Sequence, residues 1–425
     1  GRLSQQNTAK VNFCNFALSF FLMKQASLLF ITTQLPYPPV SGGKIKSWNY
    51  LKDLVNRYEL SLACLLKNGD EAQVKPMQKD LALKNFLAEK IEVKRNLWTL
   101  LKSYRNFPCL NVFRNHSDIF SKKLQPMIDQ NDILLVDHYE MFQYVPENYP
   151  GKVVLHTHNA EFMLWQRMSE LEKNPLKRKV LKKEAERVKV YEAEIFDRAD
   201  LIFATPSDTE IFKKYGFETE KHRPTYHLGN ENLLQLPRIQ FNETETALTF
   251  VGTLNWEPNV DGLIWFLDQV WPMIKQERNE IKFYIIGKEP DRRIRAAAKG
   301  DQSVIFTGFV DQLDDYLKKT RVYIAPLRFG SGMKVKVLEG LYRGIPTVTT
   351  AVGAEGLDIK NRKEAMIANE AEDFSAACLE LMKNQLLWEK LSEKSRKLAA
   401  EKYRWKPLFE KMNVDFQEIW DKRET

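Results

Sequence analysis

Cysteine and histidine are scarce in this sequence, which contains four cysteines and six histidines among 425 residues. The cysteines stand alone, at Cys14, Cys64, Cys109 and Cys378. Because no two of them have the spacing of a metal site or a redox motif, we expect reduced thiols in a cytoplasmic protein. The histidines form no HExxH motif, and no Asp-x-Asp pair is present. The sequence therefore predicts no metal site, no cofactor and a metal-independent mechanism.

An apolar run long enough for a membrane span is also missing. Residues 13–22 (FCNFALSFFL) are apolar, but they have about half the length that a span requires. Met23 and Lys24 follow instead of a small-residue cleavage site, which argues against a signal peptide. We expect residues 1–22 to be a non-native or disordered extension, with Met23 as the natural start. The alternative is a short membrane-contacting helix.

The length of the chain predicts two domains of about 200 residues each. The formal net charge of +8 favours anionic partners, such as nucleotide phosphates, nucleic acid or an acidic membrane surface. Since no basic motif interleaved with aromatic residues is present, we expect no nucleic-acid partner.

Apolar runs alternate with segments of helical periodicity along the whole chain. In the first part, we expect strands at residues 27–33, 60–66, 132–136, 153–156 and 201–204. Residues 44–56 should form a helix, and residues 74–127 read as helical and basic. After a polar stretch at 224–246, strands are expected at residues 248–251, 282–286, 304–307, 322–325 and 347–349.

This alternation predicts an α/β protein with two Rossmann-like, doubly wound parallel-sheet domains that face each other across a cleft. We place the domains at residues 23–235 and 245–405, with a C-terminal helix at 406–425 that crosses back to the first domain.

Ligands of open parallel sheets bind beyond the carboxyl ends of the strands, and several such junctions here are unusual for plain connections. Gly42 and Gly43 precede a helix, where backbone N–H groups can approach an anion; a tight turn is the alternative. His158 follows a strand together with Asn159 and Glu161, although a lone histidine is often only structural. At residues 347–357, a further strand runs into a glycine-spaced loop.

The junction at residues 328–339 (RFGSGMKVKVLE) carries the clearest signal. Its glycines expose backbone donors, while Arg328, Lys334 and Lys336 bring three positive charges to one helix start. This combination suits a diphosphate. Glu339 lies about two turns into an otherwise apolar helix, so we expect it to be partly buried against a polar ligand. The alternative is a surface helix with a basic first turn.

Together these segments resemble the large family of retaining GT-B glycosyltransferases usually called family 4, or group 1 glycosyl transferases. The resemblance extends from about residue 27 onward and is strongest over residues 248–357. There the segments FVGTLNWEPNVDGLIWF, FYIIG, VIFTGFV, IAPLRFGSGMKVKVLEGLYRGIPTVTT and GAEGL stand in the family's order. The first-half segments PPVSGG, HTHNAE and DRADLIFATPSD support it.

The resemblance implies transfer of a sugar from a UDP- or GDP-linked donor, with retention and without a metal. It assigns Glu339 to the ribose hydroxyls, Gly43 to the donor diphosphate and His158 to the transferred sugar. The catalytic residues expected on this basis are His158, Arg328 and Lys334. The expected donor-binding residues are Gly42, Gly43, Gly252, Gly308, Phe309, Gly332, Met333, Lys336 and Glu339.

Three positions depart from the family pattern. Ser331 stands where the first glutamate of the Glu-x7-Glu motif belongs, and Thr253 and Asn259 stand in place of the usual Arg and Lys that hold the diphosphate. We expect Arg328, Lys334 or Lys336 to supply the missing charge. A non-catalytic nucleotide-sugar-binding protein or a nucleotide-sugar epimerase on the same fold are the alternatives.

The acceptor is expected to be a glycan or a lipid-linked glycan of cell-surface polysaccharide biosynthesis. Lys177, Lys182, Lys183, Arg187 and Lys189 belong to a basic stretch that fits a helix. Such a stretch is usually a solvated helix face; the alternative is peripheral contact with an anionic membrane.

Overall fold

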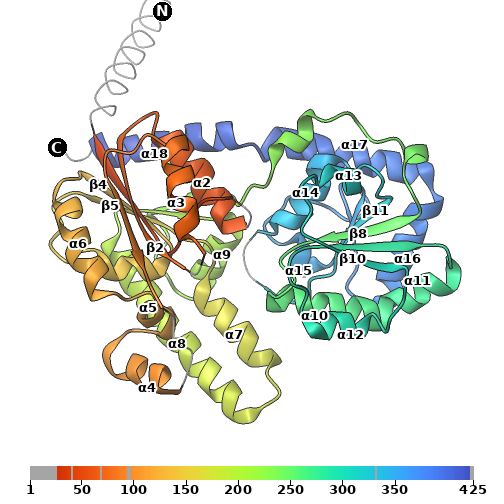
Figure 1. The fold of residues 1–425 in the computed structure, drawn as a ribbon, viewed down its shortest axis with the longest axis horizontal. Coiled ribbons are helices and arrows are strands. Elements are labelled where there is room, and N and C mark those ends of the chain that lie inside the picture. Colours follow the sequence, from red (N-terminus) through yellow and green to blue (C-terminus); the bar gives the residue numbers. More distant parts are fainter. Residues whose placement is uncertain (1–25, 40–41, 68, 93–96, 331–332, 422–425) are drawn as a thin grey trace, which may run out of the picture. The chain divides into compact units, whose positions relative to one another are not determined.

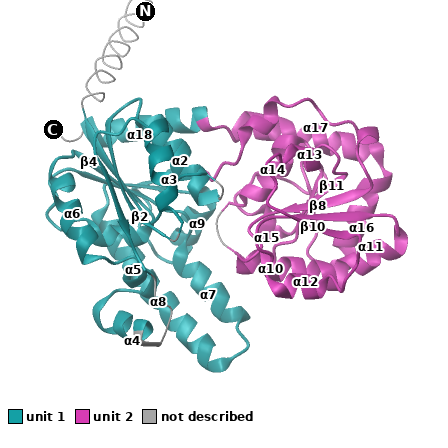
Figure 2. Ribbon diagram, viewed as in Figure 1, with its two compact units in different colours: residues 1–225, 406–425 teal, residues 226–405 magenta. Residues whose placement is uncertain are grey.

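The computed structural model describes residues 26–39, 42–67, 69–92, 97–330 and 333–421. The chain divides into two compact units (Figure 2): residues Gly1–Thr225 with Lys406–Thr425 form unit 1, and Tyr226–Trp405 form unit 2. Each unit contains one parallel sheet with helices around it (Figure 1), which confirms the predicted fold class of two Rossmann-like domains. The expectation for residues 1–22 lies outside the described residues.

The described part of unit 1 contains a seven-stranded parallel sheet with the strand order β3-β2-β1-β4-β5-β6-β7. Its strands are β1 (Ser27–Thr32), β2 (Glu59–Leu66), β3 (Phe86–Lys90), β4 (Ile133–Asp137), β5 (Lys152–His156), β6 (Leu201–Ala204) and β7 (His222–Pro224). All six residues of β1 are buried, because helices cover both faces of a parallel sheet.

The helices of unit 1 fill the connections between these strands. They are α2 (Gly42–Leu54), α3 (Glu71–Asp80), α4 (Leu97–Asn106), α5 (Leu110–Arg114), α6 (Asp118–Asp129), α7 (Glu161–Leu171), α8 (Pro175–Arg198) and α9 (Pro206–Lys214), with a 3₁₀ helix η1 (Tyr139–Tyr144). The prediction of a continuous helical segment over 74–127 is wrong, since β3 lies within it.

The C-terminal helix α18 (Trp405–Asp421) groups with unit 1 except for its first residue. Phe409 stacks on Tyr50 of α2 with 5.5 Å between the ring centroids. Asn413 donates a hydrogen bond to Asp53, also on α2. The amphipathic pattern near the C-terminus is therefore explained by packing on α2.

The described part of unit 2 contains a six-stranded parallel sheet with the order β10-β9-β8-β11-β12-β13. Its strands are β8 (Ala247–Val251), β9 (Lys282–Ile286), β10 (Val304–Gly308), β11 (Val322–Ala325), β12 (Thr347–Thr349) and β13 (Met366–Ile367). Residues 226–246, within the polar stretch between the two sets of expected strands, lie in unit 2 and include the 3₁₀ helices η2 (Glu231–Gln235) and η3 (Phe241–Glu243).

The helices of unit 2 follow the predicted alternation with the strands. They are α10 (Glu257–Trp265), the π-helical turn η4 (Phe266–Val270), α11 (Trp271–Glu277), α12 (Arg292–Ala297), α13 (Asp314–Leu317), α14 (Val335–Arg343), α15 (Ala351–Ala354), α16 (Ala371–Lys383) and α17 (Gln385–Lys402). Gly344 ends α14 in the left-handed conformation, with φ 73°, which glycine adopts without strain.

Strand order fixes where each sheet can bind a ligand. In unit 1 the chain direction across the sheet reverses between β1 and β4, and in unit 2 between β8 and β11. At such a switch point, the loops that follow the two neighbouring strands run in opposite directions and leave a crevice beyond the strand ends. Gly42 and Gly43, which the sequence placed just before a helix, are the first two residues of α2, and residues 328–339 extend from the loop after β11 into α14. Both predicted segments therefore follow a switch-point strand, β1 or β11.

Within the described residues, no helix combines the length and the apolar composition that crossing a membrane requires. The three described cysteines, Cys64, Cys109 and Cys378, are buried and free.

Candidate functional site

The loops at the switch point of unit 2 bring Lys336 to the two positions that depart from the family pattern. The Lys336 ammonium donates a 2.6 Å hydrogen bond to Oδ1 of Asn259. The Asn259 amide nitrogen in turn donates to the backbone carbonyl of Thr253 at 2.8 Å. A basic side chain from α14 therefore stands beside Thr253 and Asn259, the positions at which the sequence departs from the pattern that it resembles.

No carboxylate of the described residues forms an ion pair with Lys336, and its side chain is only partly exposed. Burial lowers the pKa of Lys336 to about 7, and the positive charge of Lys334 lowers it further, while Glu339 acts in the opposite direction. Because an anion bound beside Lys336 would favour its charged form, binding of a phosphate should raise this pKa and convert the neutral amine to the ammonium.

Glu339 lies one turn beyond Lys336 on α14 and is partly buried, as expected from the sequence. Burial raises the pKa of the Glu339 carboxyl to about 7, and Lys336 partly offsets this effect. Among the described residues, none donates a hydrogen bond to this carboxyl group. A partly buried acceptor without a donor is suited to a ligand hydroxyl.

Arg328 and Lys334 each have a carboxylate partner. Arg328 makes two hydrogen bonds to Asp261, from Nε at 2.8 Å and from Nη2 at 3.0 Å. The Lys334 ammonium lies 3.7 Å from Glu355, and its aliphatic part passes close to Gly330. Of the three basic residues predicted to supply the missing charge, Lys336 is thus the one whose charge is not neutralised within the described residues.

Glycines keep the strand ends of unit 2 free of side chains. Gly252 and Gly287 follow β8 and β9, and a Cβ atom on Gly287 would lie 2.1 Å from the Gly252 carbonyl oxygen. Gly308 has a φ of 72°, in the left-handed region that favours glycine. Phe309 follows it and exposes 55% of its surface, with the Lys288 ammonium 4.4 Å from its ring centre.

The remaining residues of the 328–339 junction are only partly described. Met333 is buried. Gly332, predicted to contact the donor, and Ser331 lie outside the described residues.

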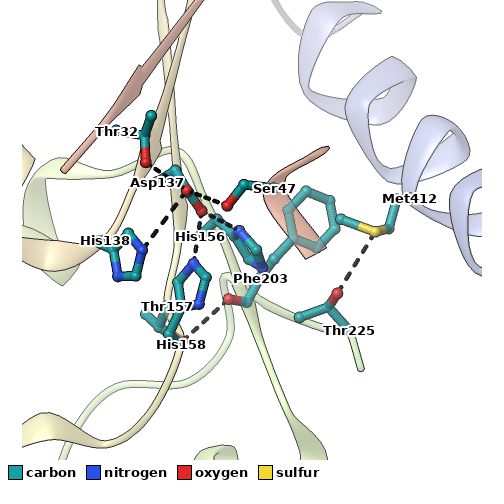
Figure 3. Close-up of polar contacts among 10 residues, drawn as sticks. All are labelled: Thr32, Ser47, Asp137, His138, His156, Thr157, His158, Phe203, Thr225 and Met412. Carbon is teal, nitrogen blue, oxygen red and sulfur yellow. Dashed lines mark hydrogen bonds and ion pairs between the residues drawn. The ribbon is translucent and has the colours of Figure 1, made fainter. Parts of the chain in front are cut away.

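In unit 1 the switch-point strands converge on Asp137 (Figure 3). Thr32, Asp137 and His156 are paired neighbours at the ends of β1, β4 and β5, so their side chains lie on the same face. Asp137 is fully buried and accepts four hydrogen bonds: from Thr32 at 2.9 Å, Ser47 at 2.7 Å, His156 Nδ1 at 2.8 Å and His158 Nε2 at 2.7 Å.

Asp137 keeps its negative charge despite this burial. Burial alone would raise its pKa, but His158 and His138 and the hydrogen bonds from His156 and His158 hold the pKa well below its usual range. The carboxylate orients the His158 ring, since Nε2 of that ring is hydrogen-bonded to Asp137. The other ring nitrogen, Nδ1, lies 3.8 Å from the position of a Cβ atom on Gly43. The predicted residues Gly43 and His158 are therefore neighbours.

His138 completes this cluster from an unusual backbone conformation. Its φ is 79°, which is strained for a residue with a side chain, and its ring stacks on that of His158 with centroids 3.6 Å apart. Burial and the neighbouring His158 lower the pKa of His138 well below its usual value. A neutral His138 thus packs against His158 and restricts its rotation.

The ligating atoms of Asp137, His138 and His158 lie within 4.8 Å of one another, as in a metal site. However, the two imidazole planes are nearly parallel, at 8°, and stacked. A metal ion bonds to imidazole nitrogen within the plane of the ring, and two stacked parallel planes share no point. The observed arrangement therefore fits a hydrogen-bonded stack better than a pair of metal ligands.

Sequence reasoning missed Asp137, His138 and Lys46. Asp137 and His138 directly follow the strand expected at 132–136, which is the signal that could have found them. Lys46 lies on the first turns of α2, is 2% exposed, and its ammonium has no hydrogen-bond partner among the described residues. Burial lowers the pKa of Lys46 to about 7, against the effects of Asp137 and Asp208. No simple pattern marks a buried lysine.

Residues 245–384, the greater part of unit 2, match the family model described as "Glycosyl transferases group 1". The chain therefore carries a group 1 glycosyl transferase domain. The chain is also 21% identical over 367 residues to an "Uncharacterized 44.6 kDa protein in cps region" of Klebsiella pneumoniae, covering 84% of this chain and 92% of that protein.

Solved structures of other proteins resemble more than nine tenths of the chain, among them the following two. Sucrose-phosphate synthase from Thermosynechococcus elongatus has a TM-score of 0.68 at 12% identity, covering 93% of this chain and 99% of that chain. Anabaena HepE in complex with UDP and glucose has a TM-score of 0.66 at 9% identity, covering 92% of this chain and 100% of that chain. At such identities the likeness shows the fold, which is that of the GT-B glycosyltransferases.

Proposed function

We propose, from the premise that residues 245–384 form a group 1 glycosyl transferase domain, that this protein is a retaining, metal-independent glycosyltransferase. It transfers a sugar from a UDP- or GDP-linked donor to a glycan or lipid-linked acceptor in cell-surface polysaccharide biosynthesis. The observation that carries the proposal is the Lys336–Asn259–Thr253 chain of hydrogen bonds beside Glu339, at the switch point of the matched domain. The complex of Anabaena HepE with UDP and glucose supports a UDP-linked donor.

The ribose, the base and the diphosphate of the donor each have a candidate partner in unit 2. Glu339 accepts hydrogen bonds from the ribose hydroxyls, and Phe309 with the Gly308 backbone borders the base. Lys336 and the backbone N–H groups at the start of α14 bind the diphosphate, because a helix N-terminus and a nearby ammonium both favour an anion. In unit 1, Gly42, Gly43 and His158 are assigned to the donor diphosphate and the transferred sugar, with Asp137 holding His158 in position.

The proposed reaction begins with activation of the donor, in which the bond between the sugar and the diphosphate is weakened. As the bond between the anomeric carbon and the outer phosphate oxygen breaks, negative charge grows on the departing diphosphate, and Lys336 stabilises that charge. The acceptor hydroxyl attacks the anomeric carbon from the side of the leaving group. Its proton passes to a phosphate oxygen of the departing nucleoside diphosphate, so the configuration is retained and no protein base is needed.

The position of Lys336 bears on the alternatives of a non-catalytic binding protein and an epimerase. Thr253 and Asn259 lack the charge that the family places there, but Lys336 restores a charge at the same strand end. Because a positive group beside the diphosphate also serves binding alone, release of nucleoside diphosphate on addition of an acceptor would distinguish an enzyme from a protein that only binds nucleotide sugars. An epimerase would be recognised by conversion of the donor sugar while the diphosphate linkage stays intact.

The test is thermal stabilisation by a panel of UDP- and GDP-linked sugars, in the wild type and in Glu339→Ala. One donor should raise the melting temperature of the wild type, and the variant should lose this shift because the ribose hydroxyls lose their acceptor. Glu393→Ala, an exposed glutamate on α17, is the matched control and should keep the shift. A folded wild type that no donor stabilises would contradict the proposal.

We further propose a cytoplasmic location with peripheral membrane contact through α8. Residues 173–180 are all exposed, and Leu176 exposes 76% of its surface among Lys177, Lys179 and other basic residues. Arg187, expected to belong to the same basic face, instead binds Glu184 and the backbone at Ser103 and Phe107. Lysines near an anionic bilayer contribute about 1 kcal/mol each. The fraction of protein that sediments with anionic vesicles should therefore decrease as the salt concentration rises. If the protein bound neutral vesicles as well as it binds anionic ones, this contact would be refuted.

A further inference from the structure

We propose that Trp256 is the stacking surface for the pyranose ring of the donor sugar. Trp256 exposes 44% of its surface, whereas tryptophans are mostly buried. Trp48, Trp265, Trp271, Trp388 and Trp405 are all buried here. Within described unit 2, the large apolar side chains that are exposed are Trp256, Phe309 and Leu386, and both aromatic ones follow strand ends at the carboxyl edge of the sheet. This inference rests on the proposed function and names a further residue of that site.

The backbone fixes the position of Trp256. It is the N-cap residue of α10, and its N–H donates to the Thr253 carbonyl at 3.3 Å. Its own carbonyl accepts from the backbone N–H groups of Asn259 and Val260, at 2.9 and 3.1 Å. The indole is therefore anchored to the same turn that holds Thr253 and Asn259.

The indole also stands next to the proposed diphosphate clamp. The Lys336 ammonium lies 5.5 Å from the centre of the Trp256 ring, while it donates to Asn259. In a nucleotide sugar a single oxygen joins the outer phosphate to the anomeric carbon. An outer phosphate bound by Lys336 would therefore bring the attached sugar into the neighbourhood of the indole.

The chemistry of the two surfaces is complementary. One face of a pyranose presents C–H groups, and an indole ring presents an apolar face with a negative quadrupole. Among the described residues, no acceptor binds the indole N–H, which leaves a donor for a sugar hydroxyl. Binding sites combine such apolar surfaces with a few polar groups that fix orientation. Trp256 would thus contribute to the choice of sugar, while Phe309, Glu339 and Lys336 bind the nucleotide part.

The test compares two ligands, the nucleoside diphosphate and the corresponding nucleotide sugar from the donor panel, by titration calorimetry. In Trp256→Ala, the ratio of their dissociation constants should shift against the sugar by about 3- to 10-fold, the range expected for one lost aromatic contact. Trp256→Phe should recover most of this ratio, because it keeps an aromatic face. Leu386→Ala, an exposed apolar residue on α17, is the control and should leave the ratio unchanged.

The outcomes separate this inference from the proposed function. If wild type and Trp256→Ala have the same ratio, the inference is overturned while the donor site stands. The inference is also overturned if Trp256→Ala weakens the binding of the nucleoside diphosphate and of the nucleotide sugar equally, because the indole would then contact the nucleotide part and not the sugar. If the folded wild type binds neither ligand, the proposed function fails and the inference with it. Thermal melting of each variant shows that the fold is intact.

Discussion

Replacing Lys336 with methionine should strongly reduce catalysis without reducing stability. The ammonium has a neutral partner, Asn259, whereas Arg328 and Lys334 have carboxylate partners, so its charge is the one available to a departing diphosphate. Removing one donor from developing negative charge in a site sheltered from water costs about 3–4 kcal/mol. We therefore expect kcat/KM to fall by about 100- to 1,000-fold.

The stability of the same variant follows from the pKa of Lys336. Burial lowers this pKa to about 7, so the folded state holds the proton less tightly than the unfolded state, whose lysine has a pKa near 10.5. Folding thus becomes less favourable as the pH falls from about 10.5 to about 7, because in this range the unfolded state takes up the proton and the folded state does not. Methionine keeps the length of the side chain and removes this penalty. At pH 7 the melting temperature of Lys336→Met should equal or exceed that of the wild type.

The assay measures initial rates of nucleoside diphosphate release together with thermal melting. Lys390→Met, at an exposed lysine on α17, controls for loss of a charge elsewhere in unit 2. Calorimetry in buffers of different ionisation enthalpy should also detect proton uptake when the wild type binds donor near pH 8, because the diphosphate raises the pKa of Lys336. A Lys336→Met variant with kcat/KM within 3-fold of wild type would refute the reasoning.

Two further predictions concern unit 1. Asp137→Asn should lower the free energy of unfolding by about 3 kcal/mol at pH 7, because the buried histidines lose a charged partner. The pKa of Asp137 is depressed in the folded state, so its contribution to the free energy of unfolding is present above pH 4 and is lost as the pH falls through the folded-state pKa. Urea unfolding of wild type and variant at pH 7 and below pH 4 checks this. An equal difference in unfolding free energy at both pH values would contradict it. Gly43→Leu should lower kcat by at least about 10-fold with little change in melting temperature, because the side chain would extend toward His158 Nδ1. Unchanged turnover in that variant would remove Gly43 from the site.

The long apolar runs of the sequence predicted most strands correctly, because a strand buried on both faces has no polar alternation to obscure it. The strands that were missed are β3, β7 and β13. β3 (Phe86–Lys90) is an edge strand that ends in Glu89 and Lys90, and β7 (His222–Pro224) is a three-residue edge strand that contains a proline. Edge strands are short and polar, so neither length nor periodicity distinguishes them from loops.

The helix start near residue 334 and the partial burial of Glu339 could be predicted, because glycines, basic residues and one acid within an apolar helix stand close together in the sequence. The contact between Lys336 and Asn259 could not, since 77 residues separate them and only the adjacency of β8 and β11 brings them together. The place of Asp137 at a strand end could be predicted, but its partners could not, because they come from β1, α2 and β5. The contacts of these residues therefore depend on which strand ends are adjacent in the sheet, and the sequence alone does not give that order.

The configuration of the product tests the central claim most directly. With the donor identified by the panel and methanol as a surrogate acceptor, ¹H NMR of the methyl glycoside reports the anomeric configuration without mutarotation. We predict a glycoside with the configuration of the donor in the wild type, and none in Lys336→Met. An inverted glycoside, or an epimerised sugar still linked to its nucleoside diphosphate, would contradict the account.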